Sequence, residues 1–246
     1  MLQNDGILLE FKAAVGEILY YKTVMDIRQI VNDEEPSAEM NTHIEMNIEQ
    51  RVVKAENGTF DIDMYIADGF TQRGVEKAPL GTIGQTISTT IDRTGKTLRS
   101  SVGDGSAQPS YPAHAVQIGD TWKNVNHLSI PIGENGQTQE ADLEHTYKLI
   151  GTEQRLGYQT AVIESHSPGI TLEIQHDAVQ TIGTNSRILF AYNEGRLVQS
   201  SVKTITAIKA QGESVTTETT IVTTLEKADS PVLEGGVGQD AFLISM

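Results

Sequence analysis

Apolar and polar residues alternate along most of this chain, and this period of two constrains the fold more than any other feature. Between residues 40 and 52, Met40, Ile44 and Ile48 share one face while His43 and Glu45 share the other. Successive side chains of a β-strand point to opposite faces of a sheet, so this alternation predicts strands with one buried face. Similar runs recur as far as residue 225, and their spacing predicts roughly ten to thirteen antiparallel strands.

Turn signals separate these runs. Asn57-Gly58 is typical of a type I′ hairpin, and Ser167-Pro168-Gly169 is interpreted as another turn. A short helix is expected only near residues 73–79. The predicted fold class is therefore all-β, as a curved antiparallel sheet or an unclosed barrel with little helix. The pattern leaves open whether the strands form one continuous sheet or two packed sheets.

The chain also looks internally duplicated. Residues 91–101 align with residues 191–201, so that Gly95 matches Gly195 and Ser100-Ser101 matches Ser200-Ser201. Two further matches keep the same order, and repeats of this kind indicate a repeated supersecondary unit. We therefore expect an N-terminal β half over residues 1–110, a C-terminal half over 111–229 that is its pseudo-repeat, and a Gly-rich tail over 230–246.

Composition excludes several classes of function. The formal net charge is −15, which argues against nucleic-acid binding because such proteins need a basic face. The chain has no cysteine, which excludes disulfides, thiolate nucleophiles and Cys-type metal sites. No apolar run approaches the length of about 20 residues that an integral membrane helix needs. As written, the chain is expected to be cytoplasmic; a leader ahead of Met1 in the natural protein would place it in the cell envelope instead.

Several motifs carry a resemblance to a known family. They include Val15-Gly16-Glu17 with Tyr21, Gly119-Asp120 followed by Trp122, and the run from Tyr192 to Ser200 that contains Gly195-Arg196-Leu197-Val198. In these motifs the chain resembles bacterial proteins of the DUF6263 type, which look like relatives of the LolA/LppX lipoprotein carriers. The resemblance implies an unclosed β-barrel around an apolar cavity. It supplies no catalytic residue.

Candidate site residues are few. Met25, Met46 and Met64 fall on the apolar faces of three successive strands, and His145 and Tyr147 share the apolar face of a later one. Flexible thioethers suit irregular apolar ligands, although core packing explains the methionines too. His145 can equally be a hydrogen-bonded core histidine. No zinc-ligand cluster or nucleophile elbow is present, so no metal, cofactor or catalytic residue is expected.

Three functions remain open. The leading hypothesis is a non-enzymatic β protein that binds a lipid, another apolar ligand or a protein segment on the concave apolar face of its sheet. The second is a structural or assembly protein that recruits a protein partner through exposed strand edges. The third is a hydrolase whose histidines and carboxylates meet only in space.

Overall fold

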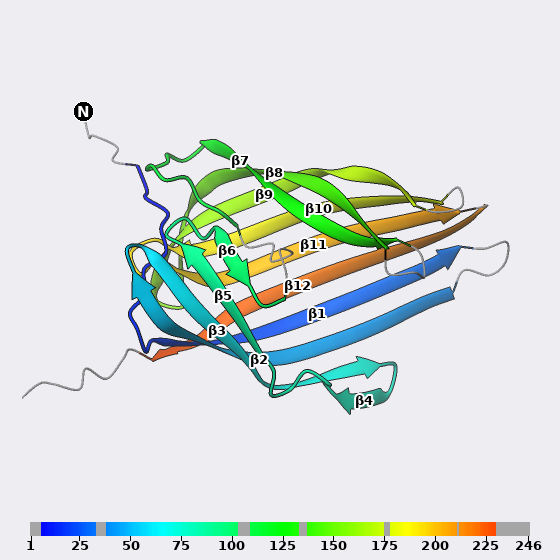
Figure 1. Cartoon of the computed structure of the whole chain (residues 1–246), viewed down its shortest axis with the longest axis horizontal. Coiled ribbons are helices and arrows are strands. Elements are labelled where there is room, and N and C mark those ends of the chain that lie inside the picture. The colour runs from blue at the N-terminus through cyan, green and yellow to red at the C-terminus, as the bar shows by residue number, and fades with distance from the viewer. Residues whose placement is uncertain are drawn as a thin grey trace, which may run out of the picture.

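The computed structural model describes residues 6–32, 38–102, 109–132, 137–174, 178–210 and 212–229. All regular structure in these ranges is strand, which confirms the all-β prediction, and the strands form one 12-stranded antiparallel sheet (Figure 1). The strands are β1 (Ile18–Asn32), β2 (Ala38–Glu56), β3 (Thr59–Arg73), β4 (Glu76–Pro79), β5 (Thr86–Asp92), β6 (Thr97–Ser100), β7 (Thr121–Ile132), β8 (Gln137–Arg155), β9 (Tyr158–Ile174), β10 (Ala178–Ala191), β11 (Arg196–Ala210) and β12 (Glu213–Asp229).

The sheet is continuous but not closed. Its strand order is β6-β5-β3-β2-β1-β12-β11-β10-β9-β8-β7, with β4 added beside β3. The first and last strands therefore pair with each other in the middle, while β6 and β7 form the two edges. In Figure 1 both edges are drawn in front of the middle strands, because the sheet curls. The twist that all strands share curls large sheets in this way.

The alternation of side chains gives the sheet two different faces. We call the face that carries Leu19, Tyr21, Ile163 and Phe190 the inner face, and its opposite the outer face. Thr23 lies two residues after Tyr21 on β1, so it is also an inner-face residue. Cross-strand partners lie on the same face, so Thr223, which pairs with Thr23, is an inner-face residue too. Ion pairs such as Lys22–Glu45 and Lys203–Glu218 lie on the outer face. Most outer-face positions are polar and meet solvent, but β9, β10 and β11 also carry a second buried apolar cluster on this face, made of Val162, Leu189, Ala191 and Val198.

Two local predictions were wrong. Residues 73–79 form a hairpin rather than a helix, because Gly74 adopts a φ of 57° and reverses the chain between β3 and β4. Strand β9 also runs straight through Ser167-Pro168-Gly169 instead of turning there. Its register against β10 shifts at this point, and Gly169, with a φ of 94°, absorbs the extra residue as a β-bulge.

Two non-strand segments cross one end of the sheet, which we call the closed end (Figure 1). The first, residues 7–17, is held to three parts of the sheet. Ile7 pairs with Val116, ahead of the edge strand β7. The Phe11 amide donates to the Arg93 carbonyl, between β5 and the edge strand β6, and the Lys12 amide donates to the Gly195 carbonyl, between β10 and β11. The second, residues 109–119, is joined to β5–β6 by the Tyr111 amide, which donates to the Thr94 carbonyl at 2.7 Å. These bonds tie the two edges together without closing the barrel.

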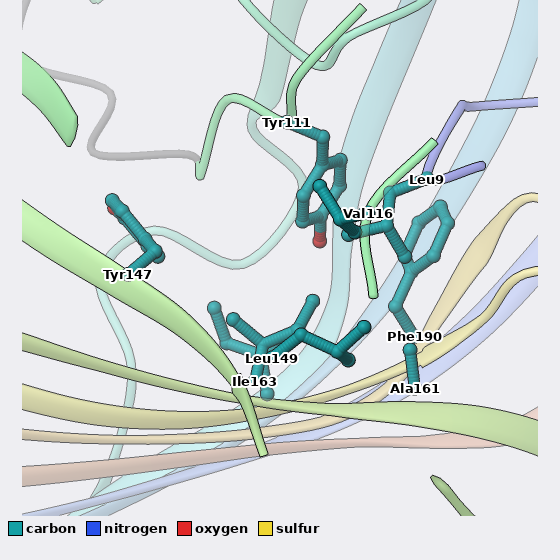
Figure 2. Close-up of a cluster of buried hydrophobic side chains, with 9 residues drawn as sticks. Leu9, Tyr111, Val116, Tyr147, Leu149, Ala161, Ile163 and Phe190 are labelled. Atoms are coloured by element: carbon teal, nitrogen blue, oxygen red, sulfur yellow. The ribbon is translucent and has the colours of Figure 1, made fainter. Parts of the chain in front are cut away.

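The main core lies beneath the crossing segments. Phe190 is fully buried, and its ring lies 5.4 Å from that of Phe11 and 4.7 Å from that of Tyr111. Figure 2 shows Leu9, Tyr111 and Val116 from the crossing segments above Leu149, Ile163 and Ala161 of the sheet. The closed end is therefore a packed core, and a ligand site must lie beside it.

The glycine pairs behind the predicted duplication share a backbone conformation. All six have positive φ: Gly16 and Gly119, Gly58 and Gly157, Gly95 and Gly195. The duplication itself stays a prediction, since shared turn geometry also arises in unrelated hairpins. The predicted tail, residues 230–246, lies outside the described residues.

Candidate functional site

A cavity of about 270 Å³ opens on the inner face beside the main core. Strands β1, β2, β3, β5, β11 and β12 form its floor and sides, and the crossing segments contribute part of its wall. The period of two directs alternate side chains of each strand into it. Its apolar walls include Phe11, Leu19, Phe60, Ile62, Met64 and Ile91. The cavity is slightly smaller than the 300–1,000 Å³ or so that is usual for drug-sized ligands, so it suits a slender apolar group.

One ion pair interrupts this apolar wall. The Arg196 Nη2 atom lies 2.7 Å from the Glu17 Oε1 atom, and the side chains are 17% and 8% exposed. Glu17 directly precedes β1 and is two residues before Leu19 and four before Tyr21. Alternate residues of an extended chain point to the same face, so its carboxylate turns inward. Arg196 opens β11 directly after Gly195. Removing one partner of such a pair costs about 3–5 kcal/mol, because the other charge stays buried.

A tyrosine completes the polar part of the cavity. The Tyr21 hydroxyl donates to the Leu197 carbonyl at 3.1 Å. Burial raises the pKa of Tyr21 well above its usual range, and the neighbouring Arg196 charge opposes only part of that rise. The hydroxyl therefore stays protonated at neutral pH and acts as a hydrogen-bond donor.

The inner face continues past the cavity toward the open end of the strands. Thr23 and Val202 line the cavity, and the next inner positions along these and the neighbouring strands are Met25, Ile221 and Met46. These three side chains are half-buried, unlike the core beneath the crossing segments. Figure 1 shows the strands reaching well beyond both crossing segments at this end. A partly exposed apolar strip therefore leads away from the cavity.

The five predicted site residues fall into three places. Met64 lines the cavity, and Met25 and Met46 lie on the strip beside it. His145 and Tyr147 lie on β8, across the main core, where Tyr147 stacks on Trp122 with ring centroids 5.7 Å apart. The structure thus groups the methionines and separates them from the other two. Their role in binding stays a prediction.

His145 and Tyr147 are buried, with exposed fractions of 5% and 4%. The His145 Nδ1 atom has no hydrogen-bond partner among the described residues, and burial lowers the pKa of this histidine. Burial also raises the pKa of Tyr147 to about 12. Both side chains are therefore uncharged at neutral pH, as core residues should be.

Sequence reasoning missed Glu17 and Arg196 as site residues. It treated them as parts of turn motifs, since each directly follows a glycine. The sequence did contain a signal for Glu17: the alternation of side chains along β1 places this charged residue on the apolar face. A charged residue at such a position needs a buried partner, and the partner came from a strand 179 residues away in sequence, 196 − 17 = 179.

Histidine–carboxylate pairs do occur, but on the outer face. His43 Nδ1 lies 2.7 Å from Asp26 Oδ1, and His127 contacts Asp142 in the same way. All four side chains are substantially exposed. No three His, Asp or Glu side chains come together as a metal site within the described ranges. The described part of the chain also contains no helical segment that could cross a bilayer.

Comparison with known proteins adds information on the fold. No protein-family model and no curated protein matches the chain. Among solved structures it is similar to lipovitellin, in a structure of lipid–protein interactions, with 12% identity and a TM-score of 0.52. The match covers 92% of this chain and 27% of that one, so this chain spans about a quarter of its length. At this identity the likeness shows the fold alone.

Two weaker matches have TM-scores too low to carry an argument. The translocator domain of autotransporter NalP from Neisseria meningitidis is 9% identical, over 86% of this chain and 89% of that one, with a TM-score of 0.22. A protein described as an outer membrane lipoprotein-sorting domain from Vibrio parahaemolyticus is 9% identical, over 85% and 84%, with a TM-score of 0.15.

Fold and cavity together define the class of protein: a single open antiparallel sheet, closed at one end by crossing segments, with an apolar cavity on its inner face. The unclosed all-β architecture expected from the LolA/LppX resemblance is present. The assignment to the DUF6263 type stays a prediction.

Proposed function

We propose that this protein is a non-enzymatic binder of an acyl chain or similar apolar chain. One observation carries the proposal: an apolar cavity of about 270 Å³ leads into a half-buried apolar strip on the inner face. A chain end placed in the cavity would bury apolar surface at about 25 cal/mol per Å². Methionines at the junction would adapt to its shape. The lipid–protein interactions named for lipovitellin, which has a similar fold, agree with this ligand class.

Binding of the apolar fluorophore phenylnaphthylamine tests this function directly. We expect fluorescence enhancement that saturates with the wild-type protein, and an acyl lipid in organic extracts of the purified protein. Met64→Glu would place a carboxylate against the apolar cavity wall and should abolish the enhancement. Tyr65→Glu is the matched control, because Tyr65 is the neighbouring residue on the outer face and is 40% exposed. Absence of binding to the wild type, or equal losses in both variants, would contradict the proposal.

A second candidate, assembly through a strand edge, is favoured by β7. This 12-residue strand pairs with β8 and forms one edge of the sheet, whereas the opposite edge strand, β6, has only four residues. Exposed edges recruit further strands. Light scattering after size-exclusion chromatography tests this candidate, and a strict monomer at all concentrations argues against self-assembly.

Location in the cell envelope is the companion proposal. It depends on a leader ahead of Met1 in the natural protein. Fractionation of the source cells, with detection of this chain in the envelope or the cytoplasm, decides between the two locations.

A further inference from the structure

Three turns at the closed end each hold an apolar side chain in solvent, directly ahead of a glycine. In the first two, the amide of the fourth residue donates to the carbonyl of the first: Glu17 to Ala14 and Asp120 to Gln117, at 3.0 Å each. The third is the two-residue loop between β8 and β9. Each apolar residue is more than half exposed, so none of them contributes much burial to the fold. We call these three residues the tip residues: Val15, Ile118 and Leu156.

Leu156 is the least expected of the tip residues. Its φ is 51°, and within the described ranges the only other non-glycine residue with a positive φ is Asn57, also at 51°. Asn57 opens the corresponding two-residue loop between β2 and β3. Asparagine suits this left-handed conformation, whereas leucine is rarely found in it. Leu156 is therefore both strained and exposed, and a local outlier of this kind points to a function rather than to folding.

The tip residues lie at the end of the sheet that also holds the cavity. Val15 is two residues after Ala13, which lines the cavity. The Gly16 amide donates to the Val52 carbonyl at 2.8 Å. The next residue, Val53, occupies a bulge in β2 and adds a further exposed apolar side chain beside this turn. A surface that contacts the tip residues would therefore lie next to the proposed acyl-chain site.

The charge of the chain indicates what kind of surface fits. With a formal net charge of −15, the protein is repelled by anionic lipid head groups. Apolar side chains need no charge to enter the boundary between head groups and acyl chains, because this binding scales with the apolar area that is buried. A fluid bilayer also accepts three separate turns at once, since its surface adapts to their positions. These properties favour a lipid surface without net charge.

We propose that the closed end docks on a zwitterionic lipid surface, with Val15, Ile118 and Leu156 inserted among the head groups. This inference rests on the proposed function, because a lipid surface is where a binder of acyl chains would collect or deliver its ligand. Docking by this end brings the crossing segments, and with them one wall of the cavity, to the membrane.

Flotation with lipid vesicles tests docking in the wild-type protein. We expect the protein to float with phosphatidylcholine vesicles, and to bind more weakly to vesicles of equal parts phosphatidylcholine and phosphatidylglycerol, whose charge repels it. Absence of flotation with phosphatidylcholine, or tighter binding to the anionic vesicles, would overturn the docking inference. Phenylnaphthylamine binding, measured without vesicles, separates the two proposals: if it persists, the proposed function stands even where docking fails. If it is absent, the proposed function is refuted whatever the vesicles show.

Leu156→Asn assigns docking to the closed end. Asparagine suits a φ of 51°, so the melting temperature should equal or exceed that of the wild type, and phenylnaphthylamine binding should be unchanged. Affinity for phosphatidylcholine vesicles should fall about tenfold, the factor that burial of one leucine side chain supplies.

Val75→Asn is the matched control for this variant. Val75 is almost completely exposed and follows Gly74 in the two-residue loop after β3, at the end of that strand away from the closed end. It should keep the wild-type affinity for the vesicles. Unchanged vesicle affinity in Leu156→Asn, or equal losses in both variants, would overturn the assignment of docking to the tip residues.

Discussion

Two adjacent leucines in the first crossing segment should differ sharply in their effect on stability. Leu9 is 1% exposed and packs in the main core, whereas Leu8 is 41% exposed. Leu9→Ala removes three buried carbons, worth about 2.4 kcal/mol in transfer free energy at about 0.8 each. The cavity that remains raises the total loss to about 3–5 kcal/mol. Leu8→Ala should cost about 1 kcal/mol or less.

Urea denaturation followed by the fluorescence of Trp122 measures both losses. The urea midpoint of Leu9→Ala should fall well below that of Leu8→Ala, with the slope m unchanged. The comparison is controlled internally, because both variants make the same substitution in the same segment. Equal midpoints would show that the crossing segment is not part of the cooperative core, and the account of the closed end would be wrong.

Two further predictions concern individual side chains. Burial raises the pKa of Tyr147 to about 12 from an ordinary value near 10, so the folded state holds the phenolic proton more tightly than the unfolded state does. The contribution of Tyr147 to the free energy of unfolding should therefore be fully present below pH 10 and decrease as the pH rises toward 12. Tyr147→Phe should lessen this fall, measured as the urea midpoint. An identical fall in wild type and variant would contradict this. Gly195→Ala would place a Cβ atom against the Lys12 backbone and should lower the melting temperature far more than Gly212→Ala, which meets no atom within 4 Å but has a similarly positive φ. Equal melting temperatures would show that the crossing segment does not lie close to Gly195.

The period of two predicted most of the fold because it is a local signal. The hairpin at Asn57-Gly58 and the apolar face of β2 follow from short stretches of sequence. Pro168-Gly169 misled the prediction, since the same residues suit a turn or a bulge, and only the neighbouring strand decides between them. The pairing of the first strand with the last also has no local signature.

The candidate site was predictable only in part, for a related reason. Met25, Met46 and Met64 share the inner face, as alternation required. Glu17 and Arg196 meet only because β11 and the start of β1 converge at the closed end. Nothing in either turn motif specifies that contact, so three-dimensional packing had to reveal the polar end of the cavity.

The central position of the β1–β12 pair bears on how the chain is made. The Thr23 and Thr223 hydroxyls form a hydrogen bond of 3.0 Å across a separation of 200 residues, so these 200 residues must be synthesised before β1 and β12 can pair. Strands β1–β3 and β7–β12 can each assemble from neighbouring hairpins. Until β12 is made, the backbone N–H and C=O groups on one side of β1 have no strand partner. Pairing between strands that are distant in sequence is slow, and the unpaired strand edge makes incomplete chains prone to aggregation. Strand β12 therefore completes the middle of the sheet, and a chain cut short before it would leave the β1 edge unpaired.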